Sequence, residues 1–120
     1  MIDHVGLPVS DYARSKEFYS RALEPLGFKL VMEFENRACG FARDDKPWFW
    51  IHQGEGAGGT HVAFRAEDTA SVDAFHEAAL AAGGEDNGRP GLREHYHPTY
   101  YAAFVHDPDG YNVEAVNHGS

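Results

Sequence analysis

The sequence predicts an α+β fold in which one β-α-β-β-β module occurs twice within a single domain. Three observations lead to this prediction: an internal repeat, the same order of helix and strand patterns after the repeated residues, and a length of 120 residues. When the chain is laid over itself with an offset of 57 residues, His4 falls on His61 and Phe18 falls on Phe75. Identical residues in equivalent strands and helices indicate two structurally equivalent modules.

The first module is expected to span residues 1–53 and the second residues 60–120. Residues 54–59 contain four glycines, so we expect this stretch to be a flexible connector. Each module opens with a short alternating strand, followed by an aspartate, Asp11 or Asp68, of the kind that begins helices. Both predicted helices carry apolar residues at i and i+4 spacing and end near glycine, as an amphipathic helix on a sheet requires.

Three further strands are predicted after each helix from alternating apolar residues and turn signals. They are residues 28–34, 37–43 and 48–52 in the first module, and 85–87, 100–105 and 111–117 in the second. The segment 88–98 is rich in Gly, Pro, Arg and His and is expected to be a loop that is mobile or covers a ligand.

Composition and charge exclude several classes of function. The net charge of −9 repels phosphate, which argues against a nucleic-acid-binding or membrane-surface protein. The single cysteine, Cys39, allows no intrachain disulfide, and no basic-plus-apolar leader opens the chain. We therefore expect a cytoplasmic protein with a small-molecule ligand.

Three residues carry the candidate chemistry. His4 and His61 occupy equivalent positions in the two modules, so a pseudo-twofold axis would bring them face to face. Glu114 lies in an otherwise apolar strand, where an unpaired carboxylate is costly to bury. Two imidazoles and a carboxylate suit a divalent ion such as Fe, Mn, Ni or Zn, whereas a buried arginine such as Arg65 is the alternative partner for the glutamate.

The chain resembles the vicinal oxygen chelate superfamily, which includes glyoxalase I, extradiol dioxygenases, and fosfomycin- and bleomycin-resistance proteins. The likeness rests on four motifs, DHVGLPVSD at 3–11, SKEFYSRALEPLGF at 15–28, THVAF at 60–64 and DPDGYNVEAV at 107–116. It implies paired modules whose sheets curl round a metal-binding cleft, with His4, His61 and Glu114 as ligands and Glu114 also as a catalytic group.

Several activities agree with the resemblance. One is a metal-dependent lyase or isomerase that chelates two oxygens of a small substrate, the second is a ring-cleaving extradiol dioxygenase, and the third is a drug-binding protein without catalysis. Many such dioxygenases resemble a doubled form of this chain, which favours the first activity for a chain of 120 residues. The resemblance also implies a homodimer.

The chain departs from glyoxalase I at the last strand of the first module. Glyoxalase I has a fourth ligand there, a glutamate, whereas this strand reads WFWIHQ and contains no carboxylate. His52 is a candidate fourth ligand, or alternatively a solvent-facing histidine at the end of a strand. Trp50 and Tyr101 are expected to bind the substrate, because aromatic walls with few polar groups are typical of small-molecule sites. Arg65 shares the strand face of His61 and is expected to meet an anionic substrate or to pair with a carboxylate.

Overall fold

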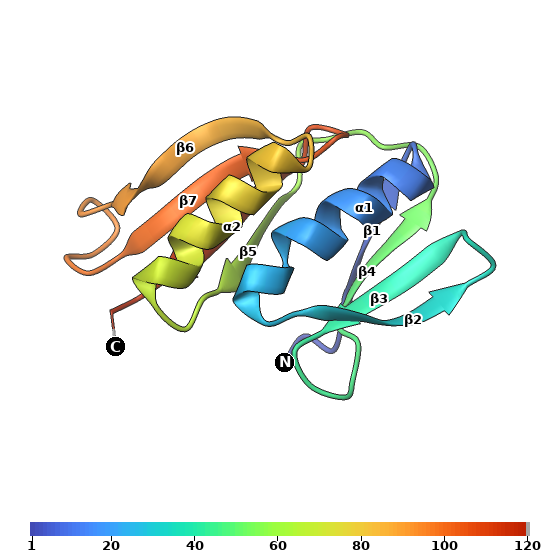
Figure 1. Ribbon diagram of the computed structural model, residues 1–120, viewed down its shortest axis with the longest axis horizontal. Coiled ribbons are helices and arrows are strands. Elements are labelled where there is room, and N and C mark those ends of the chain that lie inside the picture. The colour runs from blue at the N-terminus through green and yellow to red at the C-terminus, as the bar shows by residue number, and fades with distance from the viewer. Residues whose placement is uncertain (120) are drawn as a thin grey trace.

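The computed structural model describes residues 1–119 and confirms the α+β fold with two modules. Each module contains one four-stranded sheet and one main helix (Figure 1). The first module comprises β1 (Val5–Val9), α1 (Tyr12–Ala22), the short 3₁₀ helix η1 (Glu24–Leu26), β2 (Lys29–Phe34), β3 (Ala38–Ala42) and β4 (Phe49–Gln53). The second comprises β5 (His61–Arg65), α2 (Thr69–Ala81), β6 (Glu85–Leu92), β7 (Tyr101–His106) and β8 (Asn112–Asn117).

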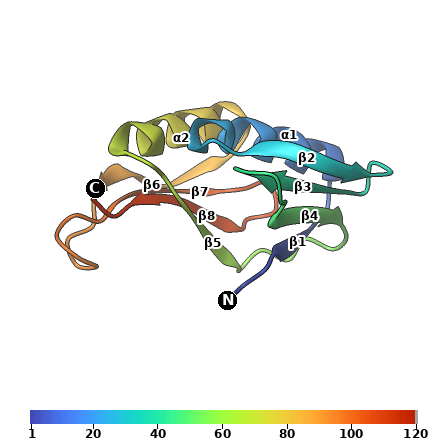
Figure 2. The ribbon, with the colours of Figure 1, turned by 90° about the horizontal axis from the view of Figure 1, so that it is seen from below.

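The two sheets have the same topology, as the internal repeat predicts. Their strand orders are β1-β4-β3-β2 and β5-β8-β7-β6, and in each sheet the first strand runs parallel to the last while the other pairs are antiparallel. The helices lie side by side over one face of both sheets, so the opposite faces are turned to the same side of the molecule (Figure 2). The sheets therefore do not close into a barrel within the chain.

Both helices begin where the sequence places an aspartate. The side chain of Asp11 accepts a hydrogen bond from the Arg14 N–H at 3.2 Å, and that of Asp68 accepts one from the Ser71 N–H at 2.7 Å. None of the helices in residues 1–119 is long and apolar enough to span a membrane.

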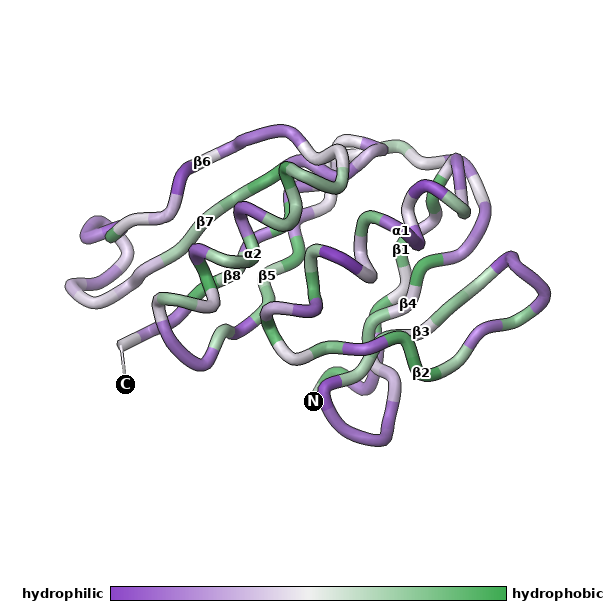
Figure 3. The backbone as a smooth tube through the Cα atoms, viewed as in Figure 1, coloured by the Kyte–Doolittle hydropathy of each residue, from purple (hydrophilic) through white to green (hydrophobic). Residues whose placement is uncertain are grey.

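One hydrophobic core runs through both modules. Phe64 of β5 packs against Phe28 and Phe49 of the first module, with ring centroids 5.3 and 5.0 Å apart. Figure 3 colours the backbone by hydropathy. Much of β7 is apolar (green) there, whereas the turns between strands are mostly polar (purple). The modules consequently share their apolar interior instead of meeting as separate units.

Polar contacts between the modules, made by the turn between β7 and β8, form what we call the module lock. The Tyr19 hydroxyl of α1 donates to Asp107 Oδ2 at 2.5 Å, and the Tyr111 hydroxyl donates to the Pro8 carbonyl at 2.7 Å. Ser10 donates its hydroxyl to Asp109 Oδ1 at 2.5 Å. These bonds join the end of β1 and the helix α1 to the start of β8, which fixes the orientation of the two sheets.

The prediction for residues 85–92 was partly wrong. A short strand near 85–87 followed by a loop over 88–98 was expected, but β6 continues to Leu92 along β7. Gly88, with φ of 152°, accompanies a register shift, and the missing N–H of Pro90 is tolerated because β6 is the outer strand of its sheet.

Candidate functional site

A buried carboxylate in the second module is the most distinctive polar feature of the structure. Glu114 lies on β8, directly across from Ala63 of β5, and its exposed fraction is 1%. Its Oε1 lies 2.8 Å from His61 Nε2, and its Oε2 accepts a hydrogen bond from the Tyr100 hydroxyl. The cross-strand neighbour on β7 is Phe104, which adds an apolar wall. A carboxylate removed from water in this way is stable only with such partners.

The two oxygens of Glu114 have different partners. Burial, followed by the bond to Glu114, raises the pKa of the Tyr100 hydroxyl above its ordinary value of 10.0, so Tyr100 is a donor at neutral pH. On the other oxygen, Oε1, the partner is His61 Nε2 at 2.8 Å. The face of the second sheet thus carries one imidazole and one carboxylate in direct contact.

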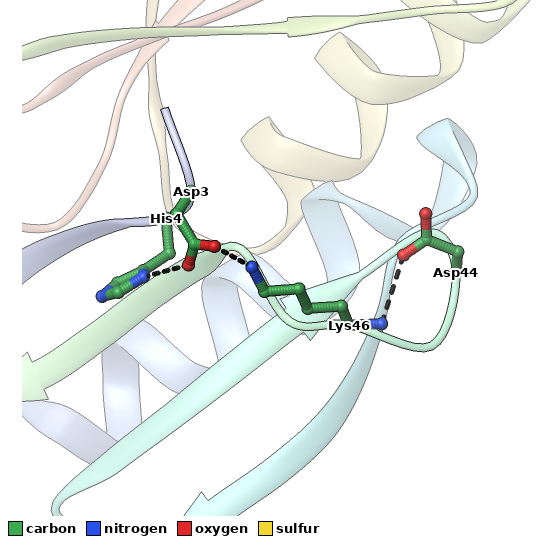
Figure 4. Close-up of polar contacts among 4 residues, drawn as sticks. All are labelled: Asp3, His4, Asp44 and Lys46. Atoms are coloured by element: carbon green, nitrogen blue, oxygen red, sulfur yellow. Dashed lines mark hydrogen bonds and ion pairs between the residues drawn. The ribbon is translucent and has the colours of Figure 1, made fainter. Parts of the chain in front are cut away.

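His4 of the first module has different partners, shown in Figure 4. Its Nδ1 lies 2.7 Å from Asp3 Oδ1, and Asp3 also pairs with the ammonium group of Lys46. Lys46 sits on the turn between β3 and β4, where its backbone N–H donates to Asp44 Oδ1 at 3.3 Å. Since Asp3 accepts, His4 donates from Nδ1 and its Nε2 carries the lone pair that could bind a metal.

Two surface hollows flank this group. The first, of about 560 Å³, is lined by Asp3, His4, Gly6, Ala38, Lys46, Pro47, Trp50, Ile51 and His52. The second, of about 610 Å³, is lined by Ile2, Asp3, Val5, Asp44, Lys46, Trp48, Thr60, His61, Val62 and Ala63. Because Asp3 and Lys46 line both hollows, their ion pair stands between the side that holds His4 and the side that holds His61.

The three predicted metal ligands do not gather within one chain. Among residues 1–119, no three His, Cys, Asp or Glu side chains lie close enough together to hold a metal ion. The structure brings His61 and Glu114 into contact and leaves His4 at the first hollow, with 60% of its side chain exposed. The two histidines are equivalent in the repeat, but His4 lines the first hollow and His61 lines the second.

Trp50 and His52 both belong to β4, the last strand of the first module. Both line the first hollow beside His4, and Trp50 stacks on Phe34 with ring centroids 5.9 Å apart and planes 17° apart. The His52 ring lies over β1, because a Cβ added at Gly6 would meet it at 3.8 Å. His52 therefore lines the same hollow as His4, and its role as a fourth ligand stays a prediction.

Arg65 lies on the same face of the second sheet as His61 and Glu114, whereas Tyr101 lies on the opposite face. Arg65 is the last residue of β5 and is exposed, with its carbonyl accepting from Arg43. The Tyr101 hydroxyl donates to Asp73 Oδ1 of α2 at 2.6 Å, on the helix-covered side of the sheet. Side chains alternate between the two faces of a strand, so Tyr100, directly before β7, lies on the side of Glu114, and Tyr101, which we expected to bind the substrate, lies on the other side.

The sequence reasoning missed the roles of Asp3, Lys46 and Tyr100. Asp3 directly precedes His4, which is a usable signal, because histidine ligands commonly donate their second N–H to a carboxylate. Nothing in the local sequence places Tyr100 near Glu114, since the two residues meet only once β7 and β8 pair.

Comparison with known proteins identifies the family. Residues 1–115 match the model of the Glyoxalase/Bleomycin resistance protein/Dioxygenase superfamily. The chain therefore belongs to this superfamily, as its motifs predict.

Individual relatives cover nearly the whole chain. Uncharacterized protein YqjT of Bacillus subtilis is 30% identical, over 94% of this chain and 95% of its own length. A glyoxalase/bleomycin resistance protein from Albidiferax ferrireducens has a similar structure, with a TM-score of 0.83, 30% identity, and coverage of 96% of this chain and 97% of its own. The fosfomycin resistance protein FosX of Listeria monocytogenes, whose E126Q mutant was solved with Mn(II) and 1S,2S-dihydroxypropylphosphonic acid, shares the fold. Its TM-score is 0.73 at 19% identity, with coverage of 100% of this chain and 90% of its own.

Proposed function

We propose that this protein is a metal-dependent enzyme that binds two adjacent oxygens of a small substrate, with lyase- or isomerase-like activity. The observation that carries the proposal is the buried Glu114 in contact with His61. Two ligand atoms about 2.1 Å from one ion and at right angles lie about 3 Å apart, which fits the 2.8 Å between His61 Nε2 and Glu114 Oε1. Imidazole and carboxylate together suit Fe, Mn, Ni or Zn.

We further propose that a second copy of the chain supplies the third ligand. His61 and Glu114 lie on the face of the second sheet that is turned away from the helices, while His4 is exposed directly before β1 of the first sheet. A symmetric pair of chains can place His4 of one copy against His61 and Glu114 of the other, and twofold symmetry then creates two such sites. The homodimer thus explains why one chain alone does not gather the three ligands.

Each of these residues then has a defined task. A divalent ion at the site would supply Lewis acidity, which polarises a bound oxygen. His4, His61 and Glu114 would hold the ion, and Trp50 would form an apolar wall that excludes water beside His4. His52, on the same wall, would be a fourth ligand or a proton-transferring group for the substrate.

Metal analysis of the protein tests the proposal. The protein purified without added metal, and then loaded with Mn(II), Ni(II), Zn(II) or Fe(II), is expected to bind one ion per chain. His61→Ala should abolish binding, whereas His95→Ala, which removes an exposed loop histidine, should leave it unchanged. A wild-type protein that binds no metal, or His61→Ala with undiminished binding, would support a drug-binding protein without catalysis instead.

Mixed dimers test the second copy directly. His4→Ala and Glu114→Ala should each lose the ion, yet a heterodimer of the two variants contains one site with all ligands intact and one site lacking two. Recovery of half the sites in purified heterodimers is the expected result. No recovery, or a monomer in light scattering, would contradict the shared site. Turnover of methylglyoxal–glutathione hemithioacetal, catechols and fosfomycin by the loaded protein would then distinguish the reaction classes.

A further inference from the structure

Tyr100 contacts the candidate metal site without being one of its ligands. Its hydroxyl donates to Oε2 of Glu114, while Oε1 of the same carboxylate lies 2.8 Å from His61 Nε2. The two oxygens of Glu114 thus have separate partners. A carboxylate with both oxygens free can bind a cation through one oxygen or through both, which changes the number of positions left for a substrate.

Building on the proposed function, we infer that Tyr100 is a positioning residue that holds Oε2 of Glu114 and leaves Oε1, beside His61, as the one carboxylate oxygen offered to a cation. Glu114 is 1% exposed, so water does not compete with the Tyr100 hydroxyl for Oε2.

Three aromatic side chains hold the Tyr100 ring in place. The rings of His97 and His118 meet it edge-on, each at 5.2 Å between centroids, and Tyr96 lies at 4.8 Å. These contacts come from the β6–β7 loop and from the residue after β8, so the ring is supported from two segments. Edge-to-face pairs at these distances restrict the ring, and therefore its hydroxyl, to one orientation.

The two histidines in turn restrain one another. His97 Nε2 lies 3.0 Å from His118 Nδ1, and the backbone N–H of Thr99 donates to His97 Nδ1 at 3.2 Å. Because Thr99 N–H can only donate, the neutral His97 ring carries its proton on Nε2 and donates it to His118. Thr99 Oγ1 also donates to the His118 carbonyl at 2.7 Å, which ties the end of β8 to the loop.

The aromatic support gives the loop before β7 a role in the site. The segment around His97 was expected to be mobile or to cover a ligand, and the structure shows His97 in contact with Tyr100. The sequence of contacts runs from Thr99 through the histidine pair to Tyr100, and from Tyr100 to Glu114 and His61. The loop thereby helps to orient the Glu114 carboxylate, through the hydroxyl of Tyr100.

The adjacent tyrosine provides a matched control. Tyr101→Phe also removes one phenol hydroxyl that bonds a carboxylate, but that carboxylate is Asp73 on the helix side of the sheet. Any effect that depends on Tyr100 and not merely on losing a tyrosine–carboxylate bond must appear in Tyr100→Phe alone.

The first measurement uses the metal-free protein. Proton NMR should show a downfield hydroxyl signal for the bond from Tyr100 to Glu114, lost in Tyr100→Phe and retained in Tyr101→Phe. In His118→Ala, where one supporting ring is absent and the hydroxyl remains, the signal should broaden. This second variant also keeps the test available if Tyr100→Phe does not fold. A signal unaffected by Tyr100→Phe, or equally sharp in folded His118→Ala, overturns the inference.

The second measurement counts the water molecules that exchange on bound Mn(II), by water-proton relaxivity. Tyr100→Phe should lose one exchanging water relative to wild type, because Glu114 can then offer both oxygens, and Tyr101→Phe should lose none. An equal count in wild type and Tyr100→Phe refutes the positioning role. If the wild type does not bind Mn(II), the proposed function fails. The NMR signal of the metal-free protein would still test the role of Tyr100 in that case.

Discussion

Replacing Tyr19 with phenylalanine tests the module lock at its most buried point. Tyr19 is fully buried on α1, and its hydroxyl donates to Asp107 Oδ2 at 2.5 Å. Asp107 also accepts the backbone N–H groups of Asp109 and Tyr111, each at 2.9 Å. The substitution removes one hydroxyl and keeps the ring, so the edge-on contact with Phe18 at 4.9 Å is retained. The change in stability therefore reports the hydrogen bond and not a lost packing contact.

The expected loss follows from the chemistry of the acceptor. A buried hydrogen bond to a charged group contributes about 1.5–3 kcal/mol, so we expect the free energy of unfolding to fall by about 2 kcal/mol at neutral pH. For a chain of 120 residues, this loss lowers Tm by about 8 °C.

The loss should depend on pH in a defined direction. Burial raises the pKa of Asp107 above its ordinary value of 3.8, outweighing the lowering by the Tyr19 hydroxyl and the backbone N–H groups. Because the folded-state pKa is raised, ionising Asp107 costs stability as the pH increases from 3.8 through that pKa. Tyr19→Phe removes a donor to the charged form, so its effect should be largest above the pKa and smallest where Asp107 is protonated.

Urea unfolding of both proteins from neutral pH down to about pH 4 measures the effect. Tyr111→Phe is the control, because its hydroxyl donates to the neutral carbonyl of Pro8 at 2.7 Å. That variant should lose about 1 kcal/mol at every pH. Equal losses in the two variants, or a loss in Tyr19→Phe that does not change with pH, would refute the assignment of the ionised Asp107 as acceptor.

Three other perturbations have defined outcomes. Gly40→Ala would place a Cβ 2.9 Å from the Trp50 ring, so we expect a loss of about 1–3 kcal/mol and a shifted tryptophan fluorescence; an unshifted spectrum would contradict the close packing. Burial raises the pKa of the Cys39 thiol, so a thiol reagent should label it only at the rate of unfolding, and rapid labelling of the native protein would contradict its burial. The His76 hydrogen bond holds the pKa of Asp86 below 3.8, so its stabilisation is present above that value and lost as the pH falls below it. Asp86→Asn should flatten the acid side of the stability profile measured by thermal unfolding, and an unchanged profile would argue against this pair.

The repeat made most of the fold predictable. His4 and His61 mark equivalent strands, and Asp11 and Asp68 begin equivalent helices, because capping and alternation are local properties of the chain. The extension of β6 through Pro90 was not predictable, since it depends on pairing with β7 and on the position of β6 at the edge of its sheet. Local propensity does not contain that information.

The candidate site could be predicted only in part for the same reason. The contact between His61 and Glu114 follows from parallel pairing of the first and last strands of a module, which the family motifs imply. The separation of His4 from both depends on how the modules pack through their helices, and no residue pattern states that arrangement. Tyr100 and Tyr101 differ in role only because consecutive side chains point to opposite faces of the sheet, one toward Glu114 and the other toward Asp73 of α2.

The shared core has a consequence for the covalent continuity of the chain. Phe64 of one half packs among Phe28 and Phe49 of the other, and the module lock adds polar bonds across the same boundary, while the glycine-rich connector 54–59 lies outside the hydrophobic core. Neither half can cover its aromatic face alone, yet the two faces are complementary without the connector. If the chain is cut between Gly58 and Gly59, each fragment should stay unfolded alone, and the two should fold when they associate. The protein is therefore a candidate for fragment complementation as a split protein.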